Sequence, residues 1–109
     1  MFTITQNQTG ALPQVIPFKA PIAGNLTIAF SGTCWSKASS SLGGVAVFLD
    51  DQQIGEAQFY FNAASMHTAL PTQLFPVMLK PGTHTITLKP LVPNTVSDQH
   101  DFFSLWILD

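Results

Sequence analysis

The 109-residue chain carries four lysines, no arginine and six acidic residues, which gives a net charge of −2. A weakly acidic chain without a basic stripe is unsuited to nucleic acid or to an anionic membrane surface. Charged residues make up 9% of the chain, against about 25% in typical soluble domains. We therefore expect a homo-oligomer that covers part of the surface. A surface of uncharged Ser, Thr, Asn and Gln is the alternative.

Cysteine content and hydropathy limit the chemistry and the location of the chain. Cys34 has no second cysteine to pair with, which excludes an intrachain disulfide and a multi-cysteine metal site. The first eight residues lack the basic and apolar regions of a signal peptide. The longest apolar run, Val45–Leu49, is too short to insert into a membrane. We expect synthesis in the cytoplasm; later release, or incorporation into a particle, stays open.

Residues 1–24 are predicted to form an extended, proline-containing N-terminal arm. Three prolines in this segment interrupt any helix or central strand, although Phe2–Thr5 alternates and could be a short strand. The large apolar residues Val15, Ile16 and Phe18 need burial, so the arm should pack on the domain or on a neighbour.

The remaining residues, 25–109, are predicted to form the folded domain. No segment has helical periodicity, and turn residues separate strands that recur at roughly ten-residue spacing. This pattern predicts an all-β protein, an antiparallel β-sandwich of jelly-roll type with seven or eight strands. Apolar alternation predicts strands at 25–31, 44–50, 54–61, 73–79, 83–88 and 102–108, with a short one possible at 67–70.

The closing strand, Phe102–Leu108, is apolar on both faces apart from Ser104. Alternate side chains of a strand point to opposite faces, and a surface strand of a lone monomer normally shows one polar face. We expect one face to fill the core and the other, led by Phe102 and Trp106, to form an oligomer interface. The predicted core face consists of Phe103, Leu105 and Ile107.

A family resemblance rests on two segments of the C-terminal third. In residues 79–88 a Leu-x-x-Gly turn feeds a threonine-rich alternating strand, Leu-Lys-Pro-Gly-Thr-His-Thr-Ile-Thr-Leu. Together with residues 103–107, this segment resembles the late strands of C1q/TNF-type jelly rolls. In that superfamily the last strand lies in the core and near a trimer axis. The resemblance implies a jelly-roll topology and a homotrimer, and it implies no binding residues.

Polar residues gather just before the closing strand, where the loop carries Asp98, His100 and Asp101. Aspartate and histidine can bind a divalent metal or hydrogen-bond sugar hydroxyls. The alternative is a turn in which Asp101 caps backbone N–H groups and Asp98 starts an Asx-turn. A metal would need a further ligand, such as His67, Asp50 or Asp51. We assign the loop to ligand binding and name no metal ligands, and whether a divalent metal binds near Asp98–Asp101 stays open.

Four further residues are candidates for contact with a sugar. Trp35 follows the predicted strand at 25–31, where a tryptophan on a loop rim can stack on a sugar face and donate its N–H. A tryptophan that caps the core is the alternative. Tyr60, Asn62 and His67 flank the loop after the predicted hairpin, and ordinary loop hydrogen bonding is the alternative for them.

Catalytic constellations are missing from the sequence. Cys34 has no adjacent base or cysteine-hydrolase signature, and Glu56 is the one glutamate, without a carboxylate partner for glycosidase chemistry. Nucleophile-elbow, zinc-protease and phosphate-loop motifs are not found. We therefore predict a protein that is not an enzyme and uses no cofactor.

Two functions fit these observations. The first is a homo-oligomeric binding module that recognises carbohydrate or another cell-surface ligand through loops at one end of the sandwich. Low charge and loop aromatic residues suit a neutral polyhydroxyl ligand, and several weak sites would add avidity. The second is a structural subunit of an assembly, such as a virion capsid-decoration or tail protein.

Overall fold

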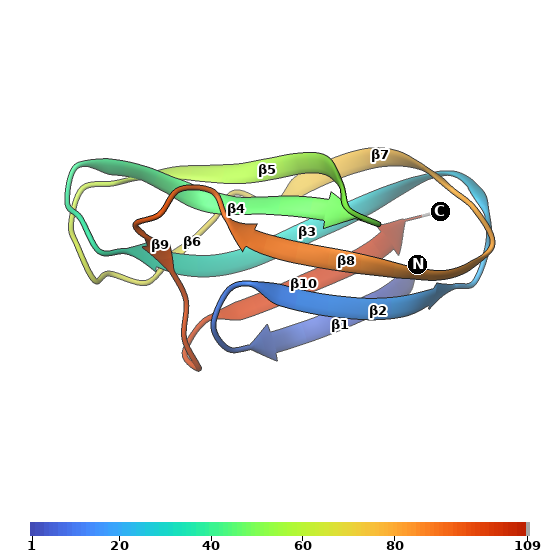
Figure 1. Ribbon diagram of the computed structural model, residues 1–109, viewed down its shortest axis with the longest axis horizontal. Coiled ribbons are helices and arrows are strands. Elements are labelled where there is room, and N and C mark those ends of the chain that lie inside the picture. Colours follow the sequence, from blue (N-terminus) through green and yellow to red (C-terminus); the bar gives the residue numbers. More distant parts are fainter. Residues whose placement is uncertain (109) are drawn as a thin grey trace.

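The computed structural model describes residues 1–108 as two antiparallel β-sheets packed face to face (Figure 1). Its strands are β1 (Phe2–Thr9), β2 (Gln14–Ala20), β3 (Gly24–Ser36), β4 (Ser41–Leu49), β5 (Gln52–Phe61), β6 (Thr68–Ala69), β7 (Gln73–Leu79), β8 (Gly82–Pro90), β9 (Thr95–Val96) and β10 (Phe102–Leu108). One sheet has the order β1-β10-β3-β6, with β7 and β9 also paired to β3, and the other has the order β2-β8-β4-β5. The predicted all-β antiparallel sandwich is confirmed. Among the residues described, no helix is long and apolar enough to cross a membrane.

The first twenty residues supply an outer strand to each sheet. β1 pairs with β10, and β2 pairs with β8 through seven residue pairs from Gln14 to Ala20. Pro17 is tolerated because β2 ends its sheet, where a missing N–H on the open side breaks no ladder bond. Residues 2–9 and 14–20 are thus strands of the two sheets, and the short strand expected at Phe2–Thr5 extends to Thr9. The proposed boundary at residue 24 stays a prediction.

The core lies between the sheets and is dominated by β10 and the strands that face it. Phe103, Leu105 and Ile107 are at most 1% exposed, which confirms the predicted core face of the closing strand. The ring of Phe103 stacks on Phe30 with centroids 6.4 Å apart. Each such side chain stabilises the fold by roughly 1.5–3 kcal/mol through the removal of apolar surface from water.

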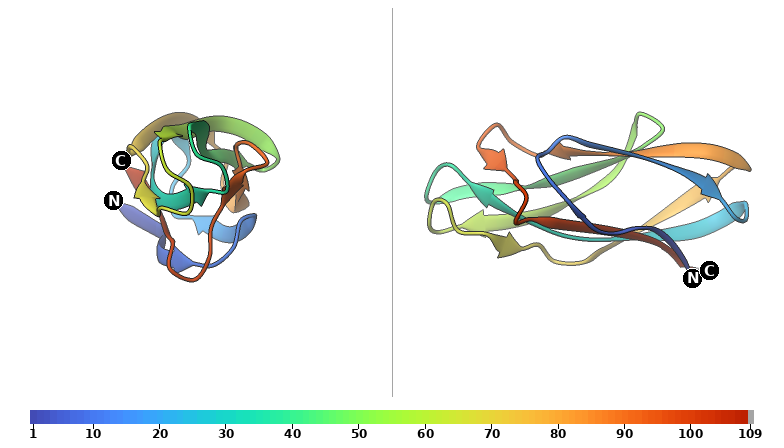
Figure 2. Two further views of the ribbon diagram at one scale, coloured as in Figure 1. Left: turned by 90° about the vertical axis from the view of Figure 1, so that its left-hand side faces the viewer. Right: turned by 90° about the horizontal axis from the view of Figure 1, so that it is seen from below.

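The end of the sandwich opposite the termini is organised by β3, which runs on to Ser36 (Figures 1 and 2). Its last residues pair with β6 through Thr33 and Cys34, and with β9 through Trp35 and Ser36. The loops that carry β6 and β9 are thereby brought against the same strand. Trp35 lies within β3, so its predicted position in a loop after residue 31 was wrong.

Gly44 anchors the loop that contains β9. Its N–H donates to Thr95 Oγ1 over 3.2 Å, and its carbonyl accepts from Leu91 N–H over 2.9 Å. The residue has a φ of 145°, and a Cβ at this position would lie 2.0 Å from the carbonyl oxygen of Ala57. Glycine is therefore required here, and through it β4 holds the segment that leads into residues 97–101.

Candidate functional site

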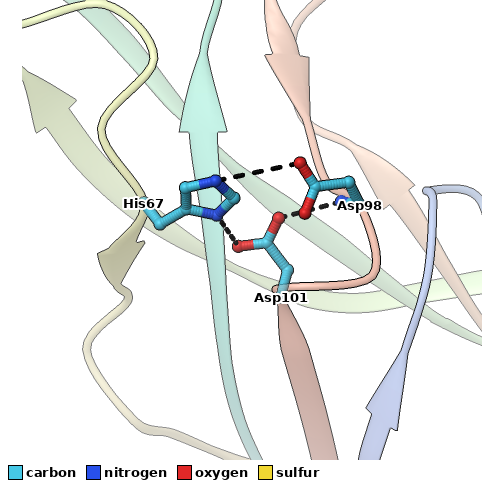
Figure 3. Close-up of side chains that lie close together, drawn as sticks. All are labelled: His67, Asp98 and Asp101. Atoms are coloured by element: carbon cyan, nitrogen blue, oxygen red, sulfur yellow. Dashed lines mark hydrogen bonds and ion pairs between the residues drawn. The ribbon is translucent and has the colours of Figure 1, made fainter.

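His67, Asp98 and Asp101 form a compact polar cluster at the β6–β9 end (Figure 3). His67 Nδ1 lies 2.8 Å from Asp101 Oδ1, and His67 Nε2 lies 3.8 Å from Asp98 Oδ2. The Asp101 side chain is fully buried, whereas those of His67 and Asp98 are 37% and 33% exposed. The structure thus brings together three of the residues that we predicted from separate loops.

The Asp101 carboxylate is held by donors from several parts of the chain. Thr33 Oγ1 donates to Asp101 Oδ1 over 2.8 Å, and the backbone N–H of Asp98 donates to Asp101 Oδ2 over 2.9 Å. Thr33 Oγ1 also accepts from the N–H of Phe102, the first residue of β10. These bonds satisfy a buried charge, as burial requires. They also fix where the loop enters the closing strand.

Residues 98–101 form the turn that was the alternative interpretation of this loop. Asp101 N–H donates to the carbonyl of Asp98, and His100 N–H donates to Asp98 Oδ1 over 2.8 Å. The second bond makes Asp98 the first residue of an Asx-turn. The turn and the cluster coexist, because each aspartate keeps an oxygen that faces His67.

Charge and burial set the protonation of two groups in this region. The hydrogen bond that His67 donates to Asp101 raises the pKa of His67 above its ordinary value of 6.5, and this effect outweighs the opposing effect of burial. Burial raises the pKa of the Cys34 thiol to about 12, and the negative charge of Asp101 adds to the rise. A thiol that stays protonated is a poor nucleophile, so Cys34 fits a buried apolar residue.

The rings of Trp35 and His100 both lie close to the ring of His67, a member of the cluster. The His67 ring centroid lies 5.9 Å from that of Trp35 and 6.3 Å from that of His100. Trp35 is half-buried, and its Nε1 is buried without a hydrogen-bond partner among the described residues. The indole N–H that we expected to donate to a sugar is therefore not at the surface.

A second feature, which we call the aromatic hollow, opens beside the end of β5 with a volume of about 360 Å³. Phe59 and Met66, 37% and 60% exposed, offer it apolar surface, and Phe59 packs edge-on against Phe61 with centroids 5.3 Å apart. Asn62 and Thr68 supply polar groups at the same place. The lining residues are Phe59, Phe61, Asn62, Ala63, Met66 and Thr68.

The hollow and the cluster share one chain segment. Met66 and Thr68 line the hollow, while His67 between them contacts Trp35 and Asp101. Tyr60 is 54% exposed but does not line the hollow. It lies between Phe59 and Phe61 in β5, and successive side chains of a strand point to opposite faces.

Sequence reasoning missed Phe59 and Met66 as candidates. Phe59 alternates with Ala57 and Phe61, which are both buried, so the sequence pattern does not distinguish Phe59 from a core residue. Phe59 becomes partly exposed because β5 is the last strand of its sheet. Met66 sits in a loop without any pattern that could have marked it.

Asp50, the other aspartate considered for a metal, is engaged elsewhere. Asp50 Oδ2 lies 2.5 Å from His84 Nδ1, and Asp50 Oδ1 accepts from Thr85 N–H over 2.9 Å. His84 Nε2 lies 2.6 Å from the carbonyl oxygen of Lys80. This second histidine–aspartate pair ties the β4–β5 turn to β8.

The outer face of the β1-β10-β3-β7 layer carries an exposed apolar surface, which we call the outer patch. Trp106 lies opposite Ala29, which in turn lies opposite Leu74, so the three side chains share one face. Phe102 follows on this face by alternation along β10, and Met78 follows along β7. Trp106 is half-buried, and the other three are exposed by 47–65%: Leu74, Met78 and Phe102.

The sequence matches no protein-family model and no curated protein. Solved structures share its fold. A family 35 carbohydrate-binding module from an environmental isolate has a TM-score of 0.53 at 18% identity, over 94% of this chain and 71% of that one. The CBM36-1 domain of a multidomain xylanase from the hindgut metagenome of Trinervitermes trinervoides has a TM-score of 0.54 at 14% identity, over 99% and 94%.

A part of a much larger protein is also similar. PorU from Porphyromonas gingivalis gives a TM-score of 0.62 at 8% identity over the whole of this chain, which spans 12% of that protein. At these identities the comparisons establish the fold, a jelly-roll β-sandwich of the kind found in carbohydrate-binding modules. The narrower resemblance to C1q/TNF domains stays a prediction.

Proposed function

We propose that this chain is a non-enzymatic carbohydrate-binding module whose ligand occupies the aromatic hollow. The main observation behind this proposal is that an exposed aromatic ring, Phe59, and a side-chain amide, Asn62, line the same hollow at one end of the sandwich. The fold shared with two carbohydrate-binding modules supports the proposal.

The lining of the hollow suits a neutral sugar. The apolar C–H face of a sugar ring packs on an aromatic ring, while amides and hydroxyls bind its hydroxyl groups. Phe59 and Met66 supply the apolar surface, and Asn62 and Thr68 supply the polar groups. None of these residues carries a charge, which favours an uncharged glycan.

A glycan array followed by calorimetry tests this proposal. Phe59→Ala should weaken binding of the array's strongest glycan by roughly tenfold or more, because one stacking contact with its buried area is worth about 1.5 kcal/mol. Tyr60→Ala is the matched control: an exposed neighbour on the same strand, outside the hollow, whose loss should leave affinity unchanged. A silent array, or equal losses in both variants, contradicts the proposal.

We also propose that the module is a homo-oligomer that buries the outer patch. Large exposed apolar side chains on one face of a domain favour contact with a partner, and the patch combines side chains of β7 and β10. The resemblance to C1q/TNF domains favours a trimer. Low overall charge is explained if subunit contacts replace part of the solvated surface.

Light scattering on the purified chain at micromolar concentration tests the oligomer. Trp106→Glu should lower the measured mass toward one chain while the thermal unfolding midpoint stays within a few degrees, because the residue is half-buried on the outer face. A wild-type mass of 11.8 kDa contradicts the oligomer. Simultaneous loss of fold and assembly in the variant would place Trp106 in the core.

The outer patch equally favours a second candidate, a structural subunit of a larger assembly such as a virion decoration or tail protein. Such a subunit would use the patch against its neighbours and would need no ligand in the hollow. A silent glycan array together with a stable oligomer disrupted by Trp106→Glu is the result that favours this candidate. The final location of the protein would then be a particle.

A further inference from the structure

His67 has one ring nitrogen committed to the protein and one directed at a carboxylate that it does not hydrogen-bond. Nδ1 is engaged by the buried Asp101 at 2.8 Å. Nε2 faces Asp98 Oδ2 at 3.8 Å, which exceeds a hydrogen bond. Figure 3 shows the imidazole facing both carboxylates, with one ring nitrogen toward Asp98 and the other toward Asp101.

We propose that His67 Nε2, Asp98 and His100 form a zinc site in which Asp101 holds His67 in place. Two ligand atoms on a tetrahedral Zn²⁺ are separated by roughly 3.4 Å when each bond is about 2.1 Å long. The observed 3.8 Å between Nε2 and Oδ2 needs only a small closure of the two side chains. The gap between these atoms is therefore of the size that one ion fills.

Asp101 supplies the outer partner that zinc-binding histidines use. A metal-bound imidazole commonly donates its other N–H to a carboxylate, which fixes the ring orientation and the tautomer. Asp101 occupies that position, is fully buried, and is itself fixed by Thr33 and by the N–H of Asp98. The arrangement needs no rotation of His67 to present Nε2.

His100 is the third ligand of the proposed site, and its side chain must turn to bind the ion. Its backbone N–H donates to Asp98 Oδ1, and its exposed ring lies perpendicular to that of His67 at a centroid separation of 6.3 Å. Two imidazoles on one tetrahedral ion have centroids about 5 Å apart. His100 is not among the three residues whose ligand atoms lie within 4.8 Å of one another, so zinc binding requires a change in the conformation of its exposed side chain. The fourth position stays open for water or a ligand hydroxyl.

The donor set selects zinc over calcium. Calcium takes six to eight oxygen ligands, whereas the proposed site offers two imidazoles, those of His67 and His100, and one available carboxylate, that of Asp98. The other carboxylate, Asp101, is already committed to His67, Thr33 and Asp98. Imidazole with a single carboxylate is a ligand set that suits Zn²⁺.

Calorimetric titration of the untagged full chain with zinc chloride at neutral pH tests the site. We expect one saturable site per chain in the micromolar range and no response to calcium chloride. His67→Gln and Asp98→Asn should each weaken zinc binding by roughly tenfold or more. His84→Gln is the matched control, since His84 is a histidine bonded to an aspartate outside the cluster, and should leave the affinity unchanged.

No saturable uptake would overturn the proposal, as would equal affinity in His67→Gln, or a loss in His84→Gln as large as that in His67→Gln. Asp98→Asn should leave the chain folded, because the Asp98 side chain is partly exposed and an asparagine oxygen can still accept from His100 N–H. Amide NMR spectra confirm that each variant is folded. The zinc titration contains no glycan, so its outcome is independent of the sugar-binding proposal.

Discussion

The two histidine–aspartate pairs of this protein have the same chemistry and opposite burial. In the pair of His67 and Asp101 the carboxylate is fully buried and the imidazole is 37% exposed. In the pair of His84 and Asp50 the imidazole side chain is 10% exposed and the carboxylate 49% exposed. With the aspartate buried, the ring of His67 stays accessible at the surface, whereas the largely buried ring of His84 joins the β4–β5 turn to β8.

The two pairs also differ in the surroundings of the second ring nitrogen, Nε2, of each histidine. His84 Nε2 is used by the carbonyl of Lys80, and the ring packs against Phe18 with centroids 5.8 Å apart. His67 Nε2 has no hydrogen bond to residues 1–108, the part of the chain that the structure describes, and faces Asp98 across 3.8 Å. The His84 pair therefore has a structural role, and the binding role of the His67 pair is the one that we propose above.

We expect the largest effect when the buried member of the His67 pair, Asp101, is replaced. Asp101→Ala removes the acceptor of bonds from Thr33, His67 and the N–H of Asp98. It should lower the free energy of unfolding by about 3 kcal/mol, because buried donors are left without partners. Urea unfolding measures this loss, and Asp50→Ala, at an exposed carboxylate, should cost less. A smaller loss in Asp101→Ala than in Asp50→Ala would contradict the contrast between the pairs.

A smaller effect concerns the pH dependence of the His84 pair. The hydrogen bond to Asp50, with that to the Lys80 carbonyl, raises the pKa of His84 above 6.5. For Asp50 burial raises the pKa, but the hydrogen bonds from His84 and Thr85 together outweigh it and hold the value below 3.8. The pair therefore stabilises the fold most between these ordinary values.

The two pKa shifts determine how the free energy of unfolding changes with pH. The His84 contribution is complete below pH 6.5 and is lost as pH rises through the raised folded pKa. The Asp50 contribution is complete above pH 3.8 and is lost as pH falls through the lowered folded pKa. Unfolding free energies measured across pH should fall on both sides in the wild type. His84→Gln should flatten the alkaline limb partly, since the pKa of His67 is raised too; an unchanged profile contradicts the assignment.

The period-two patterns in the sequence were enough to predict most strands and the core face of β10. The pattern failed at β2, where Pro17 interrupts an otherwise apolar run. It also failed at the end of β3, where Gly32 and Thr33 break the alternation before Trp35. In both places pairing with a neighbouring strand, rather than local preference, decides the conformation.

The site was predictable as a set of residue types but not as an arrangement. His67 and Asp101 are 34 residues apart in the chain, and so are Asp50 and His84. Nothing in the sequence distinguishes the pair with the exposed histidine, His67, from the pair with the largely buried histidine, His84. The difference arises from burial, which depends on where β3, β6 and β9 converge.

Mapping a glycan onto the isotope-labelled chain by NMR tests the central claim most directly. Titration with the strongest glycan from the array should shift the amide signals of Asn62, Met66 and Thr68 and the ring signals of Phe59, which line the hollow. Signals of the His84–Asp50 region should stay unchanged. Glycan-induced shifts confined to the outer patch, or the absence of any saturable shift, would contradict a binding module that works through the aromatic hollow.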